Sequence, residues 1–135
     1  MERGVIALDT NVLVRFLVAD DQAQYSRAKR MIEGALTSGE GLFVSDVVLC
    51  ETVWVLSSTY KLDRAEVGGL LAEILATTDI SIRGVDSARR ALANFIAFKG
   101  GFADYLIRDH ATLVGCGTVA TFDKALLKEP GFTAP

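Results

Sequence analysis

The stretch that decides the fold is Val5-Ile6-Ala7-Leu8-Asp9-Thr10-Asn11, in which an apolar run ends on three polar residues. Four apolar residues followed by a turn signal predict a short, fully buried strand. Asp9 stands where the chain leaves that strand, and a carboxylate there is costly unless it is paired or hydrogen-bonded. Taken alone, Asp9 is equally well explained as the cap of the helix that follows.

Outward from this stretch, short apolar strands alternate with helices along the whole chain. The further predicted strands are 42–44, 79–83, 118–121 and 132–134, and the predicted helices are 12–18, 21–36, 46–60, 63–75, 86–96, 102–114 and 123–127. Such alternation implies a parallel sheet with helices on both faces. We therefore expect one domain over residues 1–135, an α/β fold built as a three-layer α/β/α sandwich around a mostly parallel, twisted sheet of four or five short strands.

Composition narrows the class of protein. Half of the 135 residues are apolar, 23% are charged and only two are proline, which excludes a disordered tail or a collagen-like repeat. No apolar run approaches the roughly 18 residues of a membrane span, and the N-terminus lacks the layout of a signal peptide. We expect a cytoplasmic protein whose Cys50 and Cys116 are buried free thiols. The net charge of −3 does not exclude an RNA partner. If several acids belong to one site, the charge of the rest of the chain is less negative than this total.

Glu51 interrupts a strongly apolar helix. At three- and four-residue spacing it shares a helix face with Val47 and Trp54, and we expect Trp54 to lie in the core. Glutamate is almost never fully buried without a partner. Glu51 is therefore predicted to serve a site, with a structural ion pair to an arginine as the alternative.

Two further acids occupy similar places. Asp104 stands in the first turn of a predicted helix, and Asp123 follows the predicted strand 118–121. Each alone is explained as a helix cap. Considered with Asp9 and Glu51, they are expected to point into one crevice, because sites in such sheets form at the carboxyl ends of the strands.

Four acids in one crevice predict a bound cation. Two carboxylates about 5 Å apart repel by roughly 3 kcal/mol at an effective dielectric of 20, so four are tolerated only with protonation or with a cation between them. Oxygen ligands without a cysteine or histidine cluster favour Mg²⁺ or Mn²⁺. The chemistry implied is phosphodiester hydrolysis, in which one metal activates a water and a second, if present, stabilises the leaving oxygen.

These residues resemble the PIN-domain ribonucleases, and in particular the VapC-type toxins of bacterial toxin–antitoxin pairs. The segment Leu8–Arg15 is similar to the family's first motif, and Glu51 stands where its second acid stands. The segments Phe102–Ile107 and Val119–Leu126 are similar to its third and fourth motifs. The resemblance runs in order from about residue 4 to 134, and four acids in order make it specific.

The resemblance implies both a site and a function. Asp9, Glu51, Asp104 and Asp123 would be catalytic residues that bind one or two Mg²⁺ or Mn²⁺ ions, or that organise metal-bound water. The family cleaves single-stranded or structured RNA such as tRNA or ribosomal RNA, forms homodimers and is neutralised by a cognate antitoxin. The alternative is a PIN-fold module that binds RNA or a protein without significant turnover.

Other residues have secondary roles in this prediction. Thr10, Asn11 and Thr121 are expected to position the acids, or else to serve ordinary turns and caps. Arg15 and Arg108 are expected either to contact phosphate or to neutralise the acids. His110 is expected to be a surface or packing residue rather than a general base. Arg27–Arg30 and Arg89–Arg90 are expected to form solvated faces, with an RNA path as the alternative. Val67–Leu75 is expected to lie in the core, with a dimer or antitoxin surface as the alternative for part of it.

Overall fold

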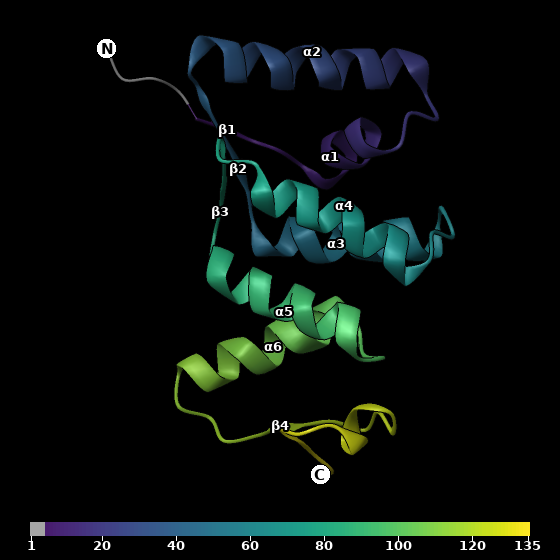
Figure 1. Ribbon diagram of the computed structural model, residues 1–135, viewed down its shortest axis with the longest axis vertical. Helices are drawn as coiled ribbons and strands as arrows, with labels where there is room; N and C mark the ends of the chain where they lie inside the picture. Colours follow the sequence, from purple (N-terminus) through teal and green to yellow (C-terminus); the bar gives the residue numbers. More distant parts are fainter. Residues whose placement is uncertain (1–4) are drawn as a thin grey trace. The chain divides into compact units, whose positions relative to one another are not determined.

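The computed structural model describes residues 5–135, which contain six α-helices and five short strands (Figure 1). The chain divides into two compact units at Val85 and Asp86.

The first unit is built on a parallel sheet of three strands. Its elements in chain order are β1 (Val5–Ala7), α1 (Thr10–Leu17), α2 (Gln22–Ser38), β2 (Gly41–Val44), α3 (Asp46–Ser58), α4 (Arg64–Ala76) and β3 (Ile80–Ile82). The strand β2 is central, and Leu42 lies opposite both Ile6 and Ile80. Leu42 and Val44 are completely buried, whereas Phe43 between them is not, so the two aliphatic side chains share the covered face of this central strand.

Helices cover this sheet. Helix α1 packs against α2 and α3, α2 contacts β2, and α4 contacts both α3 and β3 (Figure 1). The core between them is made of aliphatic side chains such as Leu13, Leu49, Leu56 and Leu71. The predicted α/β class and parallel strand pairing are confirmed, and the arrangement is consistent with the three-layer sandwich.

The helix starts follow the capping residues of the sequence. Ser45 Oγ accepts the N–H of Val48, and Asp63 forms a complete capping box with Glu66. Asp21 accepts the N–H of Gln24, but the Gln24 side chain bonds elsewhere, so only half of that predicted box forms. Capping is a contact three residues along the chain, which is why a sequence predicts it well.

The second unit has two helices and a small parallel sheet. Its elements are α5 (Val85–Ala97), α6 (Phe102–Leu113), β4 (Val119–Ala120), the 3₁₀ helix η1 (Leu126–Lys128) and β5 (Phe132–Thr133). Strands β4 and β5 pair in parallel, and the core includes Phe95, Phe102, Tyr105 and Leu126. The helix predicted over residues 123–127 is instead η1. Its shift follows from Asp123, whose side chain accepts the N–H groups of Ala125 and Leu126 and so holds a turn before the helix.

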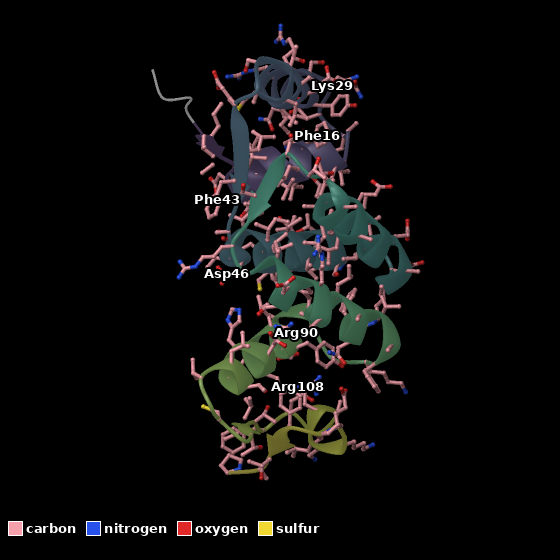
Figure 2. The ribbon with its side chains drawn as sticks, turned by 60° about the vertical axis from the view of Figure 1, so that its left-hand side comes forward. Phe16, Lys29, Phe43, Asp46, Arg90 and Arg108 are labelled. Carbon is pink, nitrogen blue, oxygen red and sulfur yellow. The ribbon has the colours of Figure 1, made fainter. Side chains whose placement is uncertain are left out.

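One ion pair joins α5 to α6. Arg90 Nε lies 2.7 Å from Asp109 Oδ1, and Arg90 Nη2 lies 3.0 Å from Asp109 Oδ2. The hydrogen bonds from Arg90 hold the pKa of Asp109 below its ordinary value. Arg90, labelled in Figure 2, is exposed, as expected of a solvated face, and it also has a partner on the neighbouring helix.

Three burial predictions are wrong. Val5 is 63% exposed, because β1 is an edge strand of the three-stranded sheet. Trp54 is 67% exposed, because α3 buries the face of Leu49, Val53 and Leu56 instead. Cys116 is exposed and Cys50 is only half-buried, with burial raising the pKa of the Cys50 thiol.

In contrast, the predicted core segment Val67–Leu75 is confirmed, with Val67, Leu71, Ile74 and Leu75 buried, and His110 is exposed as expected. No helix within residues 5–135 combines the length and apolar character needed to cross a membrane.

Candidate active site

Asp9 is the N-cap of α1. The chain leaves β1 in an extended conformation at Asp9, and the N–H of Thr10 donates to Asp9 Oδ1 at 2.8 Å. The Asp9 backbone carbonyl also accepts from Val12 and Leu13. Asp9 is exposed, and its second carboxylate oxygen takes no hydrogen bond from residues 5–135.

Thr10 and Asn11 follow Asp9 in the first turn of α1 and differ in burial. Thr10 is buried, and its hydroxyl has no hydrogen-bond partner among residues 5–135. Asn11 is exposed on the first turn of α1. The backbone N–H of Thr10, and not its hydroxyl, contacts Asp9, and the positioning role of Thr10 and Asn11 stays a prediction.

Glu51 lies on the exposed side of α3. Val47, Glu51 and Trp54 follow one another at helical spacing, and all three are exposed. Glu51 is therefore not buried among apolar residues as predicted, because the side of α3 that carries Val47, Glu51 and Trp54 is the exposed one. The structure shows no ion pair between Glu51 and any arginine in residues 5–135, and the carboxylate stands free on the helix.

Thr52, the residue after Glu51, is not marked as a candidate site residue by any pattern in the sequence. Thr52 is completely buried, and its hydroxyl has no partner in the described part of the chain. A buried hydroxyl without a partner costs free energy, so this position next to Glu51 stands out in the structure. A threonine in an apolar helix is too common for sequence reasoning to have selected it.

Asp104 is held at the start of α6. The N–H of Gly101 donates to Asp104 Oδ2 at 2.9 Å, and the side chain is half-buried. This is the local role that was the alternative to catalysis. It uses one carboxylate oxygen, and Oδ1 takes no hydrogen bond from residues 5–135.

Asp123 is held in the same way after β4. Asp123 Oδ1 accepts from Ala125 at 2.9 Å and from Leu126 at 3.2 Å. Thr121 Oγ1 accepts the N–H of Asp123 at 3.0 Å, so Thr121 fixes the backbone from which the carboxylate projects. Asp123 itself is exposed.

Arg15 is part of a polar network at the end of α1. It donates to Gln24 and to the hydroxyl of Tyr60, and it lies 3.5 Å from Asp20. Tyr60 in turn donates to Asp20 at 3.0 Å. The carboxylate that Arg15 neutralises is therefore Asp20, which the sequence analysis did not select, and contact of Arg15 with phosphate stays a prediction.

Arg108 binds the C-terminal segment of its own unit. Its guanidinium donates to the Pro130 carbonyl at 2.7 Å and lies 5.2 Å from the ring centres of both Tyr105 and Phe132. Figure 2 shows Arg108 reaching from α6 toward that segment. These contacts give Arg108 a packing role, and its contact with phosphate stays a prediction.

The four predicted acids are divided between the two units, with Asp9 and Glu51 in the first and Asp104 and Asp123 in the second. Within either unit, the described residues bring no three acidic, histidine or cysteine side chains together. The donor chemistry of the acids nevertheless fits Mg²⁺ or Mn²⁺, because every donor is a carboxylate oxygen. Three of the carboxylates are each held by backbone N–H groups through one oxygen, which leaves the other oxygen for a cation.

Comparisons with known proteins agree with the motifs. The sequence matches the family model of the PIN domain over residues 6–131, a range that includes all four acids and parts of both units. It is also 27% identical over 121 residues to a VapC ribonuclease of Aquifex aeolicus (strain VF5), covering 90% of this chain and 89% of that protein. Because the family match extends over nearly the whole chain, this protein belongs to the PIN-domain family.

Proposed function

We propose that this chain is a Mg²⁺- or Mn²⁺-dependent endoribonuclease that hydrolyses phosphodiester bonds in single-stranded or structured RNA, such as tRNA or ribosomal RNA. The observation that carries the proposal is the way Asp9, Asp104 and Asp123 are held. Each is fixed through one oxygen to a backbone N–H at a helix start or turn, with the other oxygen unused among the described residues. The similarity to a VapC ribonuclease supports the same activity.

In this proposal the four acids, Glu51 included, hold one or two divalent cations. A cation bound there would supply a Lewis acid and lower the pKa of its water. The chain's own contribution is to pre-orient the acids, since Thr10, Gly101 and Thr121 hold the backbone or carboxylate of each aspartate. Carboxylates fixed in advance need no reorganisation when the phosphate binds.

The biological role proposed is that of a toxin in a toxin–antitoxin pair. Its partners would be the RNA substrate and a cognate antitoxin protein, and the toxin would act as a homodimer in the cytoplasm. The relative's name supports the first of these partners, because that protein is a VapC ribonuclease. The exposed apolar residues of α3, such as Val47 and Trp54, offer surface for a protein partner.

The test is cleavage of a mixed cellular RNA pool by the purified chain with Mg²⁺, with Mn²⁺ and with EDTA. The variants are Asp9→Asn, Asp104→Asn and Asp123→Asn, because an amide oxygen still accepts the backbone N–H while the charge is lost. Asp79→Asn is the matched control, since Asp79 is exposed and its side chain has no partner among residues 5–135. We expect discrete, metal-dependent fragments from the wild type and the control only.

The opposite result has a definite meaning. If the wild type and Asp104→Asn release the same fragments, these acids do not carry the activity. If the wild type binds RNA but cleaves none with either metal, the chain is instead a PIN-fold binding module.

A further inference from the structure

A groove lies between α1 and α2 in the first unit. Its volume is about 330 Å³, which falls within the range of small-ligand sites. The α1/α2 groove is lined by four polar and three apolar residues: Asn11, Arg15, Gln24 and Arg27, with Val12, Ala28 and Met31. Figure 1 shows the two helices that form it.

The polar residues of the α1/α2 groove are two arginines and two amides, and the amide oxygen of Gln24 accepts from Arg15. No acidic residue lines the groove in the part of the chain that the structure describes. Arg27 is exposed, and its side chain makes no ion pair or hydrogen bond within residues 5–135. Arg15 uses Nε and Nη1 for Gln24 and Tyr60 and lies 3.5 Å from Asp20, which balances its charge, so only its Nη2 group is left to donate to a ligand and Arg27 is the unpaired cation of the groove among residues 5–135.

The apolar residues of the groove are open to solvent. Met31 is 47% exposed, and Val12 is half-buried beside it. An exposed methionine is a flexible, polarisable surface that adapts to flat apolar groups. The groove therefore offers an apolar strip bordered by cations, as the sugars and bases of a phosphate chain require.

The groove begins at a residue of the first motif. Asn11 lines it and stands two residues after Asp9 on the same helix start. A strand of substrate that reaches Asp9 and enters the groove would thus meet Asn11 and Arg15 on α1 and Arg27 on α2.

We infer that the α1/α2 groove binds single-stranded RNA next to the Asp9 side of the site, with Arg27 contacting a phosphate and Met31 lying under a base or ribose. This inference rests on the proposed function and specifies where the substrate strand runs. The occupant is RNA rather than a partner helix, because two arginines and two amides line the groove and no acidic residue among positions 5–135 does.

The test measures binding rather than cleavage. A fluorescently labelled, short single-stranded RNA of mixed sequence is titrated with the full chain in EDTA over a series of salt concentrations. The variants are Arg27→Gln and Met31→Gln. Arg30→Gln is the matched control, because Arg30 is an exposed arginine of the same helix that does not line the groove.

Arg27→Gln should weaken binding about fivefold at low salt and reduce the slope of log affinity against log salt by about 0.7, the value for one lost phosphate contact. Arg30→Gln should change affinity by less than about twofold. Met31→Gln should weaken binding with an unchanged salt slope, because it removes an apolar contact and no charge.

Equal effects of Arg27→Gln and Arg30→Gln would overturn the groove as the RNA path, and so would a wild type that binds no RNA. RNA cleavage by the wild type is scored separately. A chain that cleaves RNA with equal effects of the two arginine variants keeps the proposed function and loses this inference. A chain in which Arg27→Gln weakens binding more than Arg30→Gln does, but which cleaves no RNA, keeps this inference and loses the proposed function.

Discussion

The hydroxyl of Tyr105 on α6 donates to the carboxylate of Glu129, lying 2.9 and 3.0 Å from its two oxygens. The same hydroxyl accepts the N–H of Gly100 at 2.7 Å. Tyr105 is only 1% exposed, so one buried oxygen ties the start of α6 to the chain segment after η1.

Removing this oxygen should destabilise the second unit. Tyr105→Phe takes away the donor to Glu129 and the acceptor of Gly100, and the free energy of unfolding should fall by about 1–3 kcal/mol. Urea unfolding measures it, with Tyr25→Phe as the control because the Tyr25 hydroxyl makes no hydrogen bond among the described residues. Equal stabilities of the two variants would contradict the role of the hydroxyl.

The backbone at Gly100 is too close to its neighbours for a side chain. A Cβ there would lie 2.6 Å from the Tyr105 oxygen and 2.8 Å from Leu126 Cδ2. Gly100→Ala should therefore lower the free energy of unfolding by about 1–3 kcal/mol. Gly117→Ala is the control, because nothing lies within 4 Å of its Cβ position. If Gly100→Ala unfolds at the same urea concentration as that control, the close packing around Gly100 is wrong.

Replacing a glycine inside α4 should stabilise the protein. Gly69 is exposed, and a Cβ there would meet nothing within 4 Å. Because alanine has a higher helix propensity, Gly69→Ala should raise the free energy of unfolding by about 0.5–1 kcal/mol. A rise in melting temperature measured by circular dichroism checks it. A lower melting temperature would show that the position is not open.

The pair of Arg90 and Asp109 predicts a pH dependence. Hydrogen bonds from Arg90 lower the pKa of Asp109 in the folded protein. Its contribution is therefore complete above the ordinary aspartate pKa of about 3.9 and is lost as the pH falls through the lower, folded value. Asp109→Asn should be less stable than the wild type at pH 7, and the difference should shrink on acidification below about pH 4. A difference that stays constant between pH 7 and pH 3 would rule the ion pair out as its source.

Two substitutions of Thr121 should differ in their effect on RNA cleavage, depending on whether the hydroxyl is kept. Thr121→Val removes the acceptor of the Asp123 N–H, whereas Thr121→Ser keeps it. If Asp123 serves the proposed site, RNA cleavage should fall by about tenfold in the valine variant and should be near wild type in the serine variant. Circular dichroism checks that both are folded. Equal cleavage by the two would mean that Thr121 does not position Asp123.

The sequence by itself determined the order of elements, the helix starts and the family motifs. The contacts at Asp9, Ser45 and Asp63 span at most three residues, so local chemistry alone defines them. The parallel pairing of β1, β2 and β3 also followed from the alternation of strands and helices.

The tertiary structure decided which faces are buried and which distant groups meet. Helix α3 has apolar residues all round, so periodicity could not tell that Leu49 and Leu56 point inward while Glu51 and Trp54 point outward. The partners of Arg15 lie up to 45 residues away, at Tyr60. Contacts between residues so far apart in the chain depend on how whole helices pack, and no local sequence pattern predicts them.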